Sequence, residues 1–183
     1  RKITVRLANN FPPINNLDEQ GELIGFGRDL SDAVLREMGV EVRRLHSPKW
    51  TQVLQWLDSG ETDLIHDTGY TAEREGYLDF SIPIIEMPET IFVQPQRLDI
   101  HNIQSLNGKK VACVRNHISH IYLMNFPDIE CSVVETPLEG LYALASGGVD
   151  AYVYPKQIVE YYAQKLRLAD KVKIVGEPLR TLT

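Results

Sequence analysis

Apolar and polar residues alternate along the chain in two recurring spacings, one typical of strands and one of helices. ITVRLAN (3–9) and VEVRRL (40–45) are predicted strands, and the residues between them predict a helix that ends at Gly39. The apolar positions of that helix share one face: Leu30, Ala33, Val34 and Met38. Strand, helix and strand together form one βαβ unit.

A second helix is expected directly after the second strand. Ser47 is its predicted N-cap, Pro48 lies in its first turn, and Gly60 ends it. Its apolar stripe comprises Trp50, Val53, Leu54 and Leu57. The helix leads into TDLIH (62–66), a third predicted strand.

The same alternation begins again after residue 95. Strands are predicted at KKVACV, IECSVVE, DAYVY and KVKIV, with helices near 118–126, 137–146 and 156–167. Thr136, Pro137 and Glu139 form the capping box that marks the start of the middle helix, whose apolar stripe is Leu141, Tyr142 and Ala145. The pattern predicts an α/β fold of two lobes with parallel sheets.

The lobe boundaries follow from this repetition. We expect lobe 1 at residues 1–93, lobe 2 at 94–178 and a return crossing toward lobe 1 at 179–183, with the rest of lobe 1 outside this sequence. The two segments predicted to cross between the lobes are 90–96 and 176–183. Because the chain starts at Arg1, any signal or anchor would also lie outside it.

Composition narrows the classes of function. The chain has 183 residues, is 43% hydrophobic and carries a net charge of −6 with no run of lysine or arginine, which argues against nucleic-acid binding. No stretch approaches the roughly 20 apolar residues of a membrane span. Cys113 and Cys131 lie in separate strand-like runs without CxxC spacing, so buried free thiols and a disulfide both remain open.

The carboxyl ends of parallel strands are where such sheets bind ligands. The loop GYTAEREGYLDFS (69–81) follows the strand TDLIH and places one arginine, Arg74, in a short polar turn. Guanidinium is always charged and binds a carboxylate through two parallel hydrogen bonds. The alternative is a surface arginine paired with Glu73 or Asp79.

Five stretches, in order, carry a family resemblance: residues 9–39, Trp50 with LDSGETDLI, 70–83, 105–115 and 136–153. They resemble the bacterial extracellular solute-binding proteins of the polar amino-acid type, family 3. The resemblance implies a periplasmic binding protein type II fold, a Venus flytrap that closes on a small molecule about a hinge of two crossings. It also implies a carboxylate-binding role for Arg74.

Further site residues are implied by the same resemblance. In the first lobe, Phe11 and Trp50 match aromatic walls that sandwich the ligand, although a lone aromatic side chain more often belongs to the core. Tyr70 lies in the arginine turn. In the second lobe, Arg115 and Ser119 are candidates for closing over the ligand. The remaining candidates are Asp67, Gly69, His117 and Tyr154.

The sequence departs from the amino-acid binders at the site itself. Asp67 and Gly69 replace the glycine and threonine usually met ahead of the arginine, and Pro155 stands where an acidic residue often pairs with the ligand's ammonium. Asp67 could supply a substitute carboxylate or cap its own turn. An amino acid and an organic acid without an amine therefore both fit. His117 and His120 lack a cysteine or carboxylate partner, so neither a metal nor a cofactor is expected.

Four interpretations are weighed from these observations. A Lys156 that follows the strand ending near Pro155 resembles the flytrap modules ahead of histidine kinases and diguanylate cyclases, which favours an extracytoplasmic sensor domain attached to a membrane-anchored remainder of its own chain. The alternative is a periplasmic receptor that delivers an amino acid to an ABC permease. A cyclohexadienyl dehydratase-like enzyme is the third, disfavoured because no nucleophile or acid–base pair emerges. A purely structural module with a filled cleft is equally disfavoured.

Overall fold

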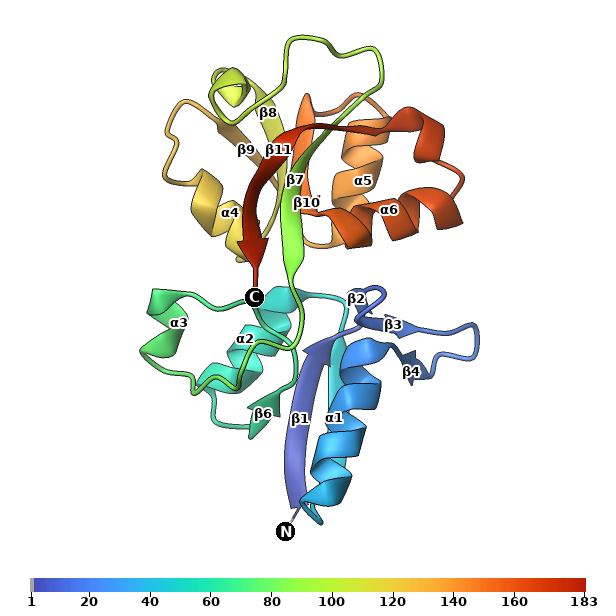
Figure 1. Cartoon of the computed structure of the whole chain (residues 1–183), viewed down its shortest axis with the longest axis vertical. Helices are drawn as coiled ribbons and strands as arrows, with labels where there is room; N and C mark the ends of the chain where they lie inside the picture. Colours follow the sequence, from blue (N-terminus) through green and yellow to red (C-terminus); the bar gives the residue numbers. More distant parts are fainter. Residues whose placement is uncertain (1) are drawn as a thin grey trace. The chain divides into compact units, whose positions relative to one another are not determined.

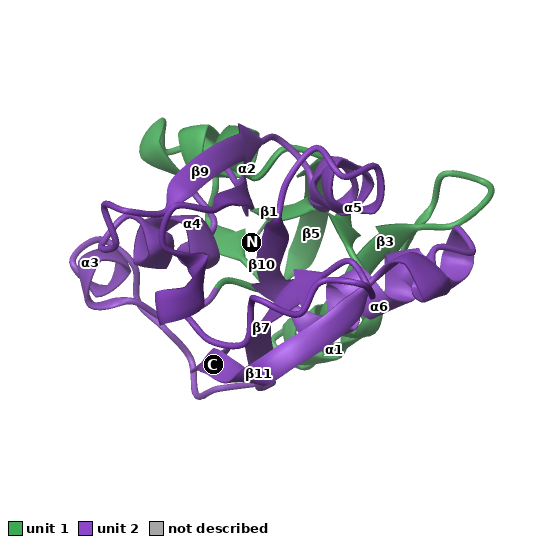
Figure 2. Cartoon of the chain, turned by 90° about the horizontal axis from the view of Figure 1, so that it is seen from above, with its two compact units in different colours: residues 1–68 green, residues 69–183 purple. Residues whose placement is uncertain are grey.

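The computed structural model describes residues 2–183, and the chain divides into two compact units, residues 1–68 and 69–183 (Figure 2). Each unit has its own α/β architecture and is described by itself. The lobe boundaries expected at residues 93 and 178 stay a prediction. No helix among residues 2–183 is both long and apolar enough to cross a membrane.

Unit 1 is built on a parallel sheet in which β1 lies between β5 and β6. Its strands are β1 (Lys2–Ala8), β5 (Glu41–Ser47) and β6 (Leu64–Ile65), and its helices are α1 (Phe26–Glu37) and α2 (Trp50–Asp58). A small antiparallel sheet between β1 and α1 was not expected from the sequence. It comprises β2 (Asn10–Phe11), β3 (Asn15–Leu17) and β4 (Leu23–Ile24).

The predicted buried face of α1 is wrong. The helix buries Gly27, Ser31 and Leu35, whereas Val34 and Met38 are 49% and 67% exposed. A Cβ on Gly27 would lie 3.0 Å from a side-chain atom of Ile14, so the helix approaches its neighbours through small residues. The buried face of α1 is therefore the one whose small residues let the helix backbone come close to its neighbours, and not the face with the most apolar side chains.

The predicted start of α2 is also wrong. Ser47 ends β5, and its hydroxyl accepts a hydrogen bond from the Lys49 N–H at 3.1 Å. Lys49 is the N-cap, and Trp50 is the first helical residue. Ser47 and Pro48 thus form the turn before the helix instead of its cap and first turn.

Unit 2 contains a five-stranded sheet in the order β11-β7-β10-β8-β9. The strands are β7 (Met87–Val93), β8 (Lys110–Val114), β9 (Glu130–Val134), β10 (Ala151–Pro155) and β11 (Lys173–Leu182). The sheet is mixed and not parallel as expected, because β7 pairs antiparallel with both neighbours. The segment after β7 holds only a 3₁₀ turn, Gln104–Leu106, and no crossover helix, so the chain enters β8 in the opposite direction.

Three helices of unit 2 confirm the sequence pattern: α4 (Ile118–Leu123), α5 (Pro137–Ala145) and α6 (Lys156–Lys165). A four-residue helix, α3 (Ala72–Glu75), lies in the loop where a turn was expected, and a 3₁₀ turn follows α6 at Ala169–Lys171. The capping box forms as predicted: Thr136 Oγ1 accepts from Glu139 N at 3.3 Å, and the Glu139 carboxylate accepts from Thr136 N. In the predicted stripe of α5, Leu141 is buried but Tyr142 is 48% exposed, because Gly140 and Leu144 turn toward the sheet instead.

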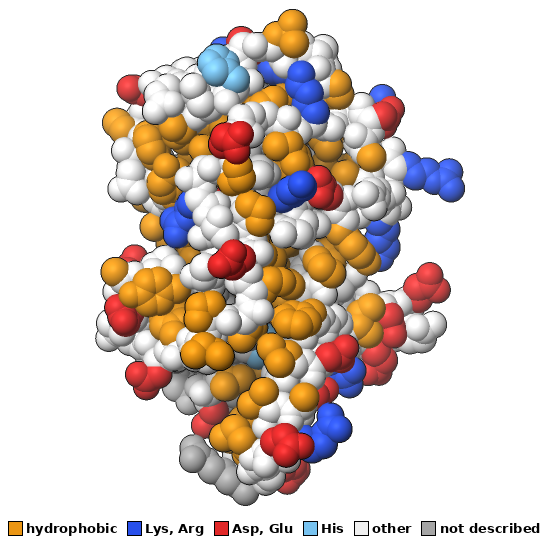
Figure 3. Space-filling model, viewed as in Figure 1, with side chains coloured by type: hydrophobic (Ala, Val, Ile, Leu, Met, Phe, Trp, Pro, Cys, Tyr) orange, Lys and Arg blue, Asp and Glu red, His pale blue; other side chains and the backbone are white. Residues whose placement is uncertain are grey.

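The core of unit 2 lies between its sheet and the surrounding helices. α4 covers one side of the sheet, and α5 and α6 cover the other (Figure 1). Its centre includes four completely buried residues: Ile91, Val111, Cys113 and Val153. On the face drawn in Figure 3, basic side chains are interspersed with acidic ones and do not gather into a stripe.

Candidate functional site

Arg74 is held in place by the turn in which it lies. Thr71 caps the short helix α3 by accepting a hydrogen bond from the Arg74 N–H at 3.1 Å. The Arg74 side chain is buried and donates from Nη1 to the Gly69 carbonyl at 2.9 Å and from Nη2 to the Asn116 carbonyl at 3.4 Å. Burial lowers the pKa of Arg74, yet guanidinium stays charged in proteins. The alternative of a surface arginine is therefore wrong.

Gly69 supports the position of Arg74 in two ways. Its carbonyl accepts the Arg74 hydrogen bond, and a Cβ at this position would lie 2.4 Å from Cδ1 of the buried Ile118. The absence of a side chain thus lets the arginine turn approach the start of α4. This explains why the residue is glycine without assigning it a ligand contact.

His117 links α4 to the strands of unit 2. It is the N-cap of α4, and its Nδ1 accepts from Ser119 N at 3.2 Å and lies 2.8 Å from Ser119 Oγ. Its ring packs against that of Tyr154 in β10, with the centroids 4.4 Å apart and the ring planes tilted by 41°. Ser119 is completely buried, so its hydroxyl is committed to His117. Four predicted residues, Arg74, His117, Ser119 and Tyr154, therefore belong to one neighbourhood.

Glu89 is the member of this neighbourhood that sequence reasoning missed. It is completely buried at the start of β7, with Oε1 3.6 Å from His117 Nδ1 and Oε2 3.4 Å from Arg180 Nε. Neither carboxylate oxygen has a hydrogen-bond partner among the described residues. An acidic residue beside the apolar run TIFV was the only signal available.

The electrostatics of this cluster follow from burial. Burial raises the pKa of Glu89 to about 7, against the opposing effect of Arg180. Burial, with Arg74 and Arg180 nearby, lowers the pKa of His117 to about 3. Between about pH 3 and pH 7 a proton in this pair therefore resides on Glu89, and His117 is neutral. The two arginines leave the cluster positive, which suits an anionic ligand.

Unit 1 contains a second carboxylate with little exposure, Asp67, whose side chain is 14% exposed and whose Oδ1 atom is buried. Its Oδ1 lies 3.3 Å from His66 Nε2, which also contacts Asn15 Oδ1 at 2.7 Å. Burial raises the pKa of Asp67 to about 7, although a hydrogen bond from Asn15 opposes the shift, and burial lowers the pKa of His66 to about 4. An ionised Asp67 would gain from a cationic partner.

The remaining candidates lie in different surroundings. Phe11 in β2 and Trp50 at the start of α2 are both half-buried in unit 1. Tyr70 is exposed; its hydroxyl donates to Glu75 at 2.7 Å and its ring packs edge-on against Phe80. Arg115, after β8, pairs with Glu135 at 2.6 Å. Ligand contact by each of these stays a prediction.

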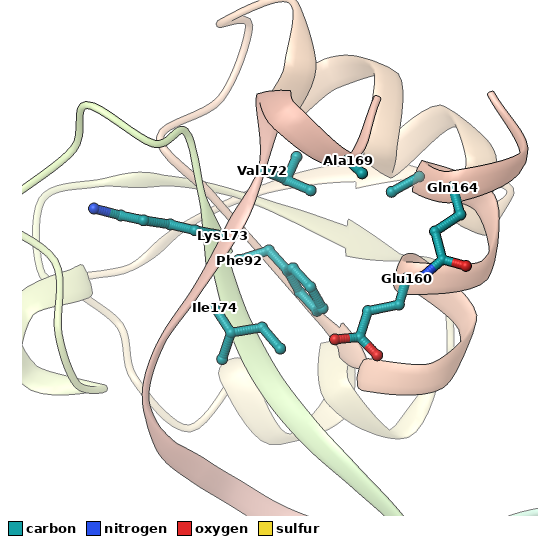
Figure 4. A pocket seen from close by; sticks show the side chains of 8 residues that line it. Phe92, Glu160, Gln164, Ala169, Val172, Lys173 and Ile174 are labelled. Atoms are coloured by element: carbon teal, nitrogen blue, oxygen red, sulfur yellow. The ribbon is translucent and has the colours of Figure 1, made fainter. Parts of the chain in front are cut away.

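A pocket elsewhere in unit 2 contains none of the candidate residues. It measures about 230 Å³ and lies between α6 and the strands β7 and β11. Phe92 forms its floor, with Glu160 and Gln164 on one side and Ile174 on the other (Figure 4). Its lining is completed by Ala163, Ala169, Val172 and Lys173. The lining offers no arginine for a carboxylate.

Two curated relatives show the range of proteins to which the chain is similar. It is 26% identical over 168 residues to a probable histidine-binding protein of Neisseria gonorrhoeae, covering 87% of this chain and 61% of that protein. It is 23% identical over 178 residues to the virulence sensor protein BvgS of Bordetella bronchiseptica, covering 94% of this chain and 14% of the sensor. The chain therefore spans less than two thirds of the length of these relatives.

The solved structures that match are likewise a sensor domain and an amino-acid-binding protein. A histidine kinase sensor domain with similarity to periplasmic binding proteins matches with a TM-score of 0.92 and 26% identity, covering all of this chain and 79% of the other. An ancestral arginine-binding protein bound to glutamine matches with a TM-score of 0.85 and 28% identity, covering 100% and 83%. The fold is that of the type II periplasmic binding proteins, as expected.

The family itself is given by a match to residues 3–173, nearly the whole described chain. The matching family consists of binding proteins, which agrees with the expectation that the chain is not an enzyme and disfavours the dehydratase alternative. On this match, the chain belongs to the bacterial extracellular solute-binding proteins, family 3.

Proposed function

We propose that this chain binds a small carboxylate-bearing solute, an amino acid or a related organic acid, through Arg74. The observation that carries the proposal is the buried guanidinium, oriented by the Gly69 and Asn116 carbonyls before any ligand arrives. A preorganised charged fork binds a carboxylate without the entropy cost of ordering a long side chain. Phe11, Trp50 and Tyr70 are proposed as aromatic contacts, and Arg115 as a contact that closes over the ligand.

The proposal includes an amine-binding role for Asp67. Pro155 cannot pair with an ammonium group, and Asp67 is a carboxylate whose ionised form is disfavoured by burial. A ligand ammonium would supply the missing positive charge. The similarity to proteins named for histidine and arginine binding supports an amino acid over a simple organic acid.

The biological setting that we propose is an extracytoplasmic sensor domain, with the membrane-anchored remainder of its own chain as its partner. It is supported by the match to a histidine kinase sensor domain at a TM-score of 0.92 and by the similarity to BvgS. The second candidate, a periplasmic receptor for an ABC permease, is favoured by the similarity to the probable histidine-binding protein.

A thermal-shift screen tests the binding proposal. Amino acids, their keto-acid and dicarboxylate analogues, and their decarboxylated amines are each added to the protein. A true ligand at a hundred times its dissociation constant stabilises by about 2.7 kcal/mol, which corresponds to a rise in melting temperature of roughly 5–11 °C. Stabilisation by amines that lack a carboxylate, with none by their parent amino acids, would contradict the proposal.

The same screen on Asp67→Asn tests the amine-binding role. We expect the substitution to abolish the shift caused by amino acids and to leave any shift caused by deaminated analogues. His46→Asn, at an exposed site in unit 1, is the matched control. Equal shifts with amino acids and deaminated analogues in the unsubstituted protein would remove Asp67 from the proposal and keep Arg74 in it.

A further inference from the structure

The two cysteines of the chain lie side by side in unit 2. Cys113 is in β8 and Cys131 in β9, and these strands pair in parallel with Cys113 opposite Val133 and Val111 opposite Cys131. Cys131 is two residues from Val133, so both cysteine side chains project from the same face of the sheet. Their Sγ atoms are 2.6 Å apart, about 0.6 Å more than a disulfide bond of roughly 2.05 Å.

The surroundings of the two thiols differ. Cys113 is completely buried among core residues that include Val111 and Val153, whereas Cys131 is half-buried on the edge strand β9. The contact with Cys131, together with burial, raises the pKa of Cys113. A hydrogen bond from Cys113 lowers the pKa of Cys131. The more accessible thiol is therefore also the one that more readily forms a thiolate.

We propose that Cys113 and Cys131 form an intramolecular disulfide that ties the edge strand β9 to β8. The paired strands, the common face and the 2.6 Å separation of the sulfurs carry this inference. Disulfides persist outside the cytoplasm, and the family to which the chain belongs is extracellular. The inference does not depend on which solute the protein binds.

The oxidant required is a disulfide, either a small-molecule one such as oxidised glutathione or that of a protein oxidase. The Cys131 thiolate attacks one sulfur of the oxidant, forms a mixed disulfide and expels the other sulfur as a thiolate. Cys113 then loses its proton and attacks the Cys131 sulfur, which expels the second thiolate. Two protein thiols thereby give up two electrons and two protons, and the oxidant becomes two thiols.

The bond would enclose the segment that supports Arg74. Residues 114–130 lie between the two cysteines, and they include α4 and the Asn116 carbonyl to which Arg74 donates. β9 is at the end of the strand order and pairs only with β8 in the described sheet. A covalent link therefore restrains an edge strand that would otherwise be held from one side.

The test compares the protein kept reduced with the protein equilibrated with oxidised glutathione. Before alkylation, we expect the oxidised protein to weigh two hydrogens less than the reduced protein. After denaturation and alkylation, the oxidised protein should take up no alkyl group and the reduced protein two. Peptide mapping should give one linked peptide pair. We expect the oxidised protein to melt about 5–10 °C higher than the reduced protein.

Single substitutions test the order of reaction. Cys113→Ser should accumulate a glutathione adduct at Cys131, whereas Cys131→Ser should not react at the buried Cys113. Two alkylated cysteines, or two glutathione adducts, in the equilibrated unsubstituted protein would overturn the proposal whatever the variants do. A bond that forms without raising the melting temperature would overturn its role in holding β9.

Discussion

At the residue scale, the proposed site depends on ionisable side chains, Arg74 and Glu89, whose burial disfavours their charged forms. Arg74 was predicted from its place in the turn 69–81, and the structure places it in a buried position between two backbone carbonyls. Glu89 was not predictable, because a strand residue gives no sign in sequence of which neighbours it will meet across the sheet. Its neighbours His117 and Arg180 are 28 and 91 residues away along the chain.

The raised pKa of Glu89 gives a prediction for stability against pH. The folded protein keeps the proton up to about pH 7, whereas the unfolded chain loses it near the ordinary value of 4.5. Between these values the folded state binds more protons, so the Glu89 contribution is complete below about pH 4.5 and is lost as the pH rises through 7. His117, with its pKa lowered to about 3, acts in the opposite direction between about pH 3 and 6.5.

Glu89→Gln isolates this contribution because glutamine has the shape of the protonated acid. We expect the variant to gain on the order of 3 kcal/mol in unfolding free energy relative to the unsubstituted protein between pH 4.5 and 8. Denaturant unfolding at several pH values measures the difference. Glu160→Gln, whose carboxylate is 44% exposed beside Lys156 at the rim of the α6 pocket, is the control and should show no such trend. A pH-independent difference for Glu89→Gln would mean that Glu89 is ionised throughout.

At the scale of elements, the sequence predicted α5 better than α1 for a physical reason. The start of α5 is specified locally, by a capping box that needs only Thr136 and Glu139. The buried face of α1 depends on how closely the helix approaches β3 and His66, which local periodicity does not contain. Ser31 is buried there because its hydroxyl lies 3.2 Å from His66 Nδ1, while the apolar Val34 remains exposed.

Gly140 shows the same dependence on close approach and gives a second prediction. A Cβ at Gly140 would lie 2.5 Å from Cζ of Tyr152, a completely buried ring whose hydroxyl donates to the Pro137 carbonyl. Gly140→Ala should therefore lower the unfolding free energy by about 1–3 kcal/mol despite the better helix propensity of alanine. Denaturant unfolding measures the change, with Tyr142→Ala on the exposed side of α5 as the control. A stabilised Gly140→Ala protein would show that α5 can shift away from β10.

At the scale of the whole molecule, the class of fold was predictable and the direction of β7 was not. Alternating strands and helices predicted two α/β units, and the family match over residues 3–173 agrees with this architecture. The reversal of β7 depends on how the chain returns to β8 through residues 94–109, where no regular pattern specifies the path. The identity of the solute depends in the same way on side chains brought together from distant parts of the sequence.

The central claim is that Arg74 binds the carboxylate of the solute, and titration calorimetry with the best ligand of the screen tests it most directly. We expect Arg74→Lys and Arg74→Ala to raise the dissociation constant by roughly 30-fold to several-thousand-fold, because truncation leaves a desolvated carboxylate without its paired donors. Arg97→Gln is the control, because Arg97 pairs with Asp99 and Asp150 and not with the Arg74 turn. This variant should bind the ligand as tightly as the unsubstituted protein. Folded Arg74 variants that bind as tightly as the Arg97→Gln control would contradict the account.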